Sequence, residues 1–155
     1  MLLEIQEPTD YTISMEKCNS EGEPIPENLI HQGIGYDKMF ECFHYDNFTE
    51  DELLAKYKLE PSVDEENESY KITTHISYDR TPIFSLKRID VKSAYTREKA
   101  ERPSSLSVVD GAGKIKWADG EIEIVKGDCI FIPKETVKFT VEGNVSLIEC
   151  LPPKI

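Results

Sequence analysis

The chain has too few basic residues for a nucleic-acid-binding protein. Its 155 residues include 30 Asp and Glu but only 18 Lys and Arg, which gives a formal net charge of −12. Phosphate backbones are bound by basic faces, so we expect no nucleic-acid partner. The acidic excess lies in residues 1–70, with 18 acidic and 4 basic side chains against 12 and 14 in residues 71–155. This asymmetry predicts two segments of different character.

The chain also lacks a long apolar run and any close pair of cysteines. No stretch approaches the roughly 20 apolar residues that span a bilayer, and the acidic start is unlike a signal peptide. We therefore expect no membrane partner and a cytoplasmic protein. The four cysteines form no CxxC pair, which argues against a zinc knuckle. Cys129 and Cys150 lie in apolar segments, where we expect them to fill a core.

Histidine is scarce, and its spacing predicts no metal site. His31, His44 and His75 share neither an HxH nor an HExxH pattern, so they would make a poor zinc site. His75 is expected on the face of a strand. His31 stands before Gly33 and Gly35, and glycines beside a histidine form either a ligand-contacting loop or a plain turn into a helix. We favour the turn and keep the loop as an alternative.

Residues 1–68 mix strand, helix and linker signals. Alternating apolar residues predict strands at 2–6 and 11–15. Apolar residues at helical spacing follow in 36–43, and the Thr-Glu-Asp-Glu run at 49–52 is a capping box that begins a second helix. The acidic run 64–68 is expected to be a solvated linker.

From residue 69 onward the pattern is strand and turn. Residues 70–78 alternate strictly, and Asp119-Gly120 is a strong hairpin signal. Gly111, Gly113 and Gly143 are expected at turns between strands. About eight short strands at this interval predict a jelly roll or small sandwich. The predicted fold class is therefore mainly β, with a short helical segment before a jelly roll or β-sandwich.

Two blocks of sequence resemble a known family. Residues 127–139 (Gly-Asp turn, apolar strand, Pro133, second strand) resemble the second motif of cupin barrels, in which Lys138 stands where metal-binding cupins carry a histidine ligand. A charged ammonium has no lone pair for a metal. Residues 3–12 resemble the stretch that closes the catalytic cupin of class I mannose-6-phosphate isomerases. Residues 107–113 and 127–133 resemble the degenerate C-terminal cupin of the same enzymes.

This resemblance implies a domain organisation and a missing metal site. The family interconverts mannose 6-phosphate and fructose 6-phosphate with a bound divalent metal, usually zinc. Its metal ligands precede the Glu-Ile-Gln block, so the resemblance places all of them before Met1 and implies no cofactor in this chain. Residues 1–68 would be the tail of the catalytic cupin (two strands), two connecting helices and the acidic linker. Residues 69–155 would be the metal-less jelly roll.

Three residues are candidates for a substrate pocket: Glu4, Gln6 and His31. By the resemblance, Glu4 matches an acid of the family's active site, whereas Ser14 falls on the position of an arginine. Glu4 and Gln6 lie on the same side of a predicted strand, which is either a pocket wall or an exposed polar edge. The basic residues between Lys87 and Arg102 could attract a sugar phosphate or the chain's own acidic segment 41–68, and we favour the second.

The resemblance implies a role in carbohydrate metabolism. We expect the C-terminal part of a mannose-6-phosphate isomerase-like protein, an aldose–ketose isomerase, and we expect the isolated chain to be inactive. The alternative is a non-catalytic cupin module for packing, dimerisation or sugar sensing. A sugar phosphate is the expected small molecule. Unpaired strands near residues 2–15 leave a homodimer open.

Overall fold

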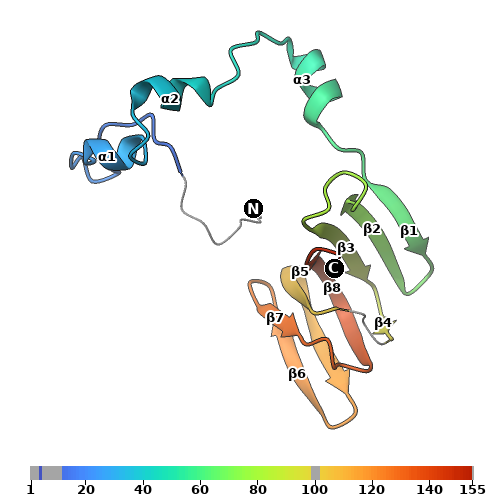
Figure 1. The fold of residues 1–155 in the computed structure, drawn as a ribbon. Helices are drawn as coiled ribbons and strands as arrows, with labels where there is room; N and C mark the ends of the chain where they lie inside the picture. The colour runs from blue at the N-terminus through green and yellow to red at the C-terminus, as the bar shows by residue number, and fades with distance from the viewer. Residues whose placement is uncertain (1–3, 5–11, 99–101, 155) are drawn as a thin grey trace. The chain divides into compact units, whose positions relative to one another are not determined.

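The chain folds as two compact units, Met1–Leu53 and Leu54–Ile155. The computed structural model describes residue 4 and residues 12–98 and 102–154 (Figure 1). None of the helices in these residues is long and apolar enough to cross a membrane. The elements are α1 (Glu27–Ile30), α2 (Tyr36–Glu41), α3 (Glu50–Tyr57), β1 (Ser62–Glu66), β2 (Tyr70–Ile76), β3 (Ser85–Val91), β4 (Ala94–Arg97), β5 (Ser104–Trp117), β6 (Gly120–Val125), β7 (Cys129–Ile132) and β8 (Phe139–Leu151).

The first unit is helical where it is described, and the strand predicted at 11–15 is not found there. Residues 12–15 have no regular structure, and the backbone N–H of Ser14 donates to the Ile30 carbonyl at 3.0 Å, at the end of α1. A strand needs a partner strand, and this stretch bonds to a helix end instead. Apart from Glu4, the strand predicted at 2–6 lies outside the described residues.

The capping box at the start of α3 is confirmed. The Thr49 N–H donates to Glu52 Oε2 at 2.8 Å, and the Glu52 N–H donates back to Thr49 Oγ1 at 3.4 Å. The backbone hydrogen bond from Thr49, helped by the one from its hydroxyl, lowers the pKa of Glu52. No residue of α3 is buried, so this local reciprocal cap is the best-defined determinant of where the helix begins.

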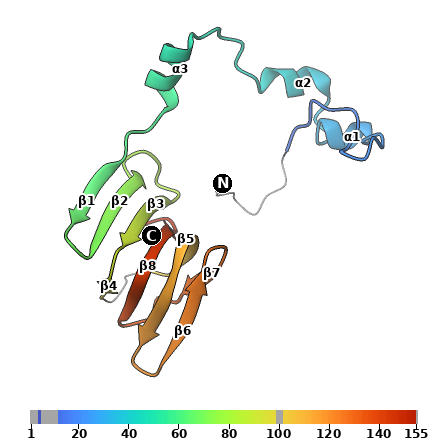
Figure 2. The same cartoon turned by 180° about the vertical axis from the view of Figure 1, so that it is seen from behind.

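The second unit is a curled antiparallel sheet that confirms the mainly β fold (Figures 1 and 2). Its strands follow the order β1-β2-β3-β8-β5-β6. The first half of β8 also pairs with β4, and the first half of β5 also pairs with β7. The two longest strands, β5 and β8, therefore lie at the centre of the sheet and carry its shorter strands on both sides.

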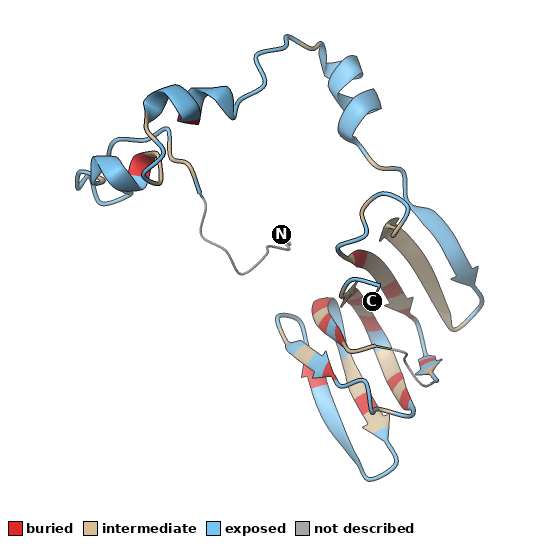
Figure 3. Ribbon diagram, viewed as in Figure 1, coloured by how far each residue is buried: buried red, intermediate tan, exposed pale blue. Residues whose placement is uncertain are grey.

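The core of this unit is aliphatic and lies between the curled parts of the sheet. Figure 3 shows buried positions gathered along β3, β5 and β8. Alternate residues of each strand face inward, as the two-residue period of a strand requires. The buried cluster consists of Ile89, Val91, Tyr95, Leu106, Val108, Ile115, Ile124, Ile132, Phe139, Val141, Val145 and Leu147.

The acidic segment predicted as a linker is instead the edge strand β1. All five of its residues are exposed, so burial does not explain the strand. Cross-strand contacts do: Asp64 Oδ2 accepts from Thr74 Oγ1 at 2.7 Å and from Lys87 Nζ at 2.8 Å. Glu66 pairs with Lys71 at 2.9 Å. The acidic residues thus find their partners on β2 and β3. In the basic region, Lys87 pairs with this segment as expected, whereas Arg88 and Arg97 pair with Asp90 and Glu149 outside it.

The glycines predicted at turns lie inside two continuous strands. Gly111 and Gly113 fall within β5, and Gly143 falls within β8, where these two strands pair closely. A Cβ atom at Gly111 would lie 2.1 Å from the Asn144 carbonyl oxygen, and Gly111 has φ +76°. These glycines therefore permit a close backbone approach and do not end a strand.

Burial of Leu106 should account for a large share of the stability of the second unit, whose curled sheet is called the barrel from here on. Leu106 is 0% exposed in the middle of the core cluster. We expect Leu106→Ala to lower the free energy of unfolding by about 2–5 kcal/mol, because it removes buried methyl groups and leaves a cavity. Urea unfolding followed by circular dichroism measures this. The control Val63→Ala, at a side chain 53% exposed on β1, should change stability by about 0.5 kcal/mol or less. Equal effects would contradict this assignment of the core.

The cysteines should differ in reactivity, because the expectation that Cys129 fills the core is wrong. Cys129 begins β7 and is exposed, like Cys18 and Cys42, whereas Cys150 is half-buried in β8. Burial raises the pKa of the Cys150 thiol. Because the thiolate is the nucleophile, we expect iodoacetamide to alkylate Cys150 at least about tenfold more slowly than Cys129 in the folded protein. Peptide mass spectrometry measures both rates. In denaturant the difference should vanish, and equal rates in the folded state would contradict the burial.

Candidate functional site

The Gly-Asp turn of the second cupin motif docks onto the middle of β5. Gly127 has φ +103°, a conformation that favours glycine. Its N–H donates to the Val108 carbonyl at 2.9 Å, and the Val108 N–H donates to the Asp128 carbonyl at 2.8 Å. The Asp128 carboxylate accepts from the Val125 N–H at 2.8 Å. The turn is therefore fixed on both sides before β7 begins.

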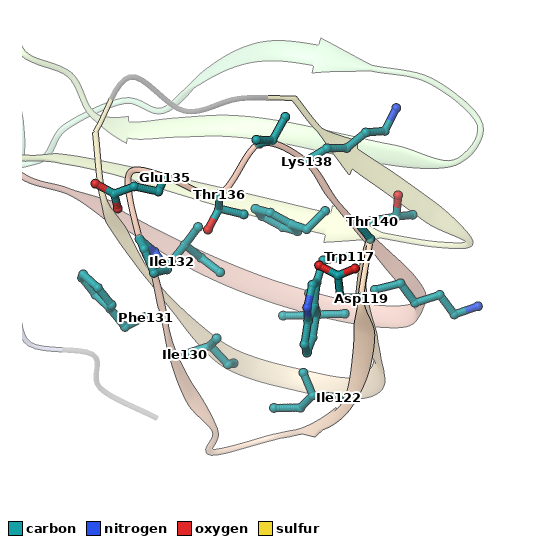
Figure 4. A pocket seen from close by; sticks show the side chains of 16 residues that line it. Trp117, Asp119, Ile122, Ile130, Phe131, Ile132, Glu135, Thr136, Lys138 and Thr140 are labelled. Carbon is teal, nitrogen blue, oxygen red and sulfur yellow. The ribbon is translucent and has the colours of Figure 1, made fainter.

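Beyond the turn, β7 and the following loop form the wall of a cavity. Ile132 is buried in the core cluster, and its neighbour Phe131 points out with 68% exposure. The loop after Pro133 then leads to the start of β8, where Phe139 returns to the core. This path leaves an open recess of about 780 Å³ between β7, the loop and the β5–β6 hairpin (Figure 4).

The cavity is apolar on its floor and over much of its rim. Three buried residues of the core, Ile115, Ile132 and Phe139, form the floor. Figure 4 shows ring and aliphatic side chains around the opening, and those exposed by 42% or more are Trp117, Ile122, Phe131 and Val137. A recess of this size and composition suits an apolar group.

Trp117 is fixed by the hairpin that sequence analysis predicted. β5 ends at Trp117 and β6 begins at Gly120, so the Asp119-Gly120 prediction is confirmed. A Cβ atom at Gly120 would lie 2.9 Å from the indole Cζ2 of Trp117. The missing side chain therefore lets the indole lie across the hairpin at the mouth of the cavity.

Four charged side chains line the cavity at its rim: Lys116 and Lys138 are engaged by neighbouring glutamates, and Asp119 and Glu135 also line it. Lys138 Nζ pairs with Glu98 Oε1 at 2.9 Å, and Lys116 Nζ pairs with Glu142 Oε2 at 2.6 Å. The Lys138 side chain is 56% exposed, and the next residue, Phe139, occupies the inward position. The cavity thus offers an apolar surface with charges at its edge. Such a surface suits the binding or packing of an apolar group.

No histidine is among the described residues that line the cavity. Among the described residues, no group of three His, Cys, Asp or Glu side chains could hold a metal ion. His75 lies on β2, where the register with β3 shifts between Thr74 and Ile76, so the face that it takes stays a prediction. The absence of a cofactor from this chain stays a prediction.

The predicted substrate-pocket residues fall in the first unit, Met1–Leu53, whereas the residues that line this cavity belong to the second. Glu4 is exposed, and Gln6 lies outside the described residues. His31 follows α1, and its Nδ1 accepts from the backbone N–H groups of Gly33 at 3.1 Å and Gly35 at 3.2 Å. Among the described residues, no hydrogen bond or ion pair joins Glu4 to His31. Their role in a pocket stays a prediction.

The apolar residues that line the cavity were not predicted as a site from the sequence. Phe131 and Val137 flank Pro133 in the motif itself, but a motif comparison directs attention to the position of the metal ligand. The usable signal was the alternation of the strand, which places Phe131 outward once Ile132 is inward. Such an exposed aromatic side chain beside a loop is more informative than the ligand position.

Comparison with known proteins gives a family match on the barrel. The family described as "Mannose-6-phosphate isomerase, cupin domain" matches residues 68–152. "Putative mannose-6-phosphate isomerase YvyI" of Bacillus subtilis (strain 168) is 29% identical over 86 residues, which are 56% of this chain and 27% of that protein. The chain thus spans about a quarter of this curated relative.

Solved structures with similar folds include several cupin-type proteins. The mannose 6-phosphate isomerase from Bacillus subtilis has a TM-score of 0.58 at 20% identity, over 88% of this chain and 38% of that one. The nucleoside dehydratase Pac13 of Streptomyces has a TM-score of 0.54 at 19% identity, over 64% of this chain and 84% of that one. Ectoine synthase from P. lautus has a TM-score of 0.52 at 13% identity, over 59% and 70%. At these identities the likeness concerns the fold.

The family match has a clear structural counterpart. Residues 68–152 contain β2 to β8, and with them the whole core cluster, the Gly127-Asp128 turn and the cavity beside it. The match covers more than half of the 155 residues. The chain belongs to the mannose-6-phosphate isomerase cupin-domain family.

Proposed function

We propose that this chain serves as the second, non-catalytic barrel of a mannose-6-phosphate isomerase-like protein. On this proposal it contributes packing to the assembly and does not isomerise sugar phosphates alone. The observation that carries the proposal is the inward position of Phe139 beside an outward Lys138. The residue at the ligand position of metal-binding cupins, Lys138, thus points out of the barrel, and the neighbouring phenyl ring fills the interior.

The chemistry of the reaction supports the same proposal. Moving a proton between adjacent carbons needs a positioned base and groups that stabilise the developing negative charge. The lysines of the apolar cavity, Lys116 and Lys138, are each held by a glutamate. The cavity walls near the core are aliphatic and aromatic. This arrangement favours contact with an apolar partner over proton transfer to a sugar.

An assay of the purified chain tests this function. We expect less than stoichiometric zinc by elemental analysis and no turnover of mannose 6-phosphate in a coupled assay, with or without added Zn²⁺. The physical reason is that the barrel interior offers apolar side chains where a metal would need lone pairs. A complete mannose-6-phosphate isomerase serves as the positive control. Stoichiometric zinc together with turnover would overturn the proposal.

A second candidate function, dimerisation through the rim of the cavity, is favoured by its exposed side chains. Phe131 and Val137 are both 68% exposed, and Trp117 is 44% exposed. They lie around one recess, so they form a patch and not scattered single residues. Clustered exposed apolar groups are typical of interaction surfaces. Two copies of the chain would bury this patch on each other.

Measurement of molar mass tests the dimer. Under this second function, light scattering after size-exclusion chromatography gives the mass of a dimer for the unmodified chain. The double substitution Phe131→Ser with Val137→Ser should then give a monomer, because it removes apolar area from the rim. The control Ile83→Ser, at a side chain 47% exposed away from the cavity, should leave the dimer intact. A monomeric unmodified chain would exclude this function.

A further inference from the structure

The buried polar side chains of the barrel gather at one end of its interior. Among the described residues, the buried polar or charged ones are Ser85, Ser104 and Glu149, each less than 5% exposed. Glu149 forms an ion pair with Arg97, whose side chain is 14% exposed. Burial of such groups is costly, so their concentration in one place requires an explanation.

These side chains face the inside of the barrel and not its outer surface. On β3, Ser85 and Lys87 alternate in phase with the core residue Ile89. On β8, Glu149 is in phase with the core residue Leu147. The long strands therefore change from apolar to polar along the same inward face. The polar residues form one end of the lumen.

A second cavity of about 560 Å³ opens at this polar end. It is separate from the apolar cavity, because the two share no lining residue. Hydroxyl, carboxylate and cationic side chains dominate its wall. The lining residues are Ser62, Asp64, Thr74, Ser77, Tyr78, Asp79, Ser85, Lys87, Arg97, Arg102, Leu151 and Lys154.

Two of its four cations are neutralised by carboxylates, one on the exposed strand β1 and one buried on β8. Lys87 pairs with Asp64 at 2.8 Å, and Arg97 pairs with Glu149 while its Nη1 donates to Ser104 Oγ at 3.1 Å. Burial by itself would raise the pKa of Asp64, but the hydrogen bonds from Lys87 and Thr74 and the charge of Lys87 lower it overall. These pairs build a fixed polar wall.

The other two cations flank one aromatic ring at the opening. The Arg102 guanidinium lies 5.4 Å from the centre of the Tyr78 ring, and Lys154 Nζ lies 4.9 Å from it. Arg102 Nη1 donates to Tyr78 Oη at 3.1 Å, and that hydroxyl donates to the Pro152 carbonyl. In the described part of the chain, neither Arg102 nor Lys154 forms a salt bridge. The guanidinium and the ammonium are thus held close to the same ring, with N–H donors available to a ligand.

We propose that this polar end of the barrel binds a small hydroxylated anion, with its phosphate or carboxylate against Arg102 and Lys154. A guanidinium beside an ammonium suits either anion, since both accept several charge-assisted hydrogen bonds. Hydroxyl groups of the ligand would meet Thr74, Asp79 and the Lys87–Asp64 pair on the wall. The cavity volume lies in the range of about 300–1,000 Å³ that holds small ligands. The site is independent of both functions proposed above.

Titration of the chain with defined anions tests the site. The probes are glucose 6-phosphate, gluconate and inorganic phosphate, with glucose as the neutral control, all at constant ionic strength. Chemical shifts of the backbone amides report binding and its location. We expect saturable shifts at residues of β3 and at Tyr78, Arg102 and Lys154, and none with glucose. The stronger of the first two probes identifies the anionic group, and inorganic phosphate shows whether the hydroxylated body contributes.

Removal of the two flanking charges should weaken binding. We expect Arg102→Gln with Lys154→Gln to raise the Kd at least about tenfold, because charge-assisted hydrogen bonds are lost. The control Lys114→Gln with Lys126→Gln removes the same net charge from residues that pair with Glu121 and Asp110, outside this cavity. It should leave the Kd unchanged. Should the first double variant fail to fold, Lys154→Gln alone, at an exposed side chain, should still weaken binding.

Two results would overturn the proposal. One is the absence of saturable shifts with all three anions. The other is equal weakening in the two double variants, which would show attraction to overall charge and not a site. Neither result depends on isomerase turnover, zinc content or molar mass, so failure of this site and failure of the proposed functions are distinguishable.

Discussion

The pairing of β5 with β8 is the interaction on which the rest of the barrel depends. Eleven registered residue pairs join them, from Ser105 with Cys150 to Lys116 with Thr140. The free side of β8 then carries β3 and β4, and the free side of β5 carries β6 and β7. The close approach of the two backbones at Gly111 leaves no room for a Cβ atom. Glycine at this crossing is therefore a condition for the whole sheet.

The same two strands give the barrel two chemically different ends. β8 begins with the inward phenyl ring of Phe139, beside the apolar cavity, and carries the buried carboxylate of Glu149 near its other end. β5 runs the opposite way, from the buried hydroxyl of Ser104 to the buried Ile115. Because the strands are antiparallel, their polar positions meet at one end and their apolar positions meet at the other.

Features set by neighbouring residues could be predicted from the sequence, and features set by distant partners could not. The Asp119-Gly120 hairpin and the Thr49 capping box are local, and both are confirmed. The acidic strand β1 depends on Lys87, 23 residues from Asp64 in the chain, so its composition suggested a linker. Gly111 was interpreted as a turn residue. Its actual role depends on the β8 backbone that passes next to it, which the sequence does not show. The sequence offered a sugar phosphate as one partner of the basic residues between Lys87 and Arg102. It could not show that three of them share a cavity with Lys154, because these cations come from separate strands and loops.

The buried Arg97–Glu149 pair is difficult to explain by stability alone. Taking both charges out of water costs several kcal/mol, and a well-packed apolar pair of similar volume is often as stable or more so. The rest of the inward face of β8, at Val141, Val145 and Leu147, shows that aliphatic residues fit this interior. An ion pair at the next inward position of β8 therefore lowers the apolar area that the barrel can bury. It does, however, fix Arg97, whose Nη1 also donates to Ser104 Oγ, in the wall of a polar cavity. A ligand site at this end of the barrel explains why a costly buried ion pair is present, whereas packing alone does not.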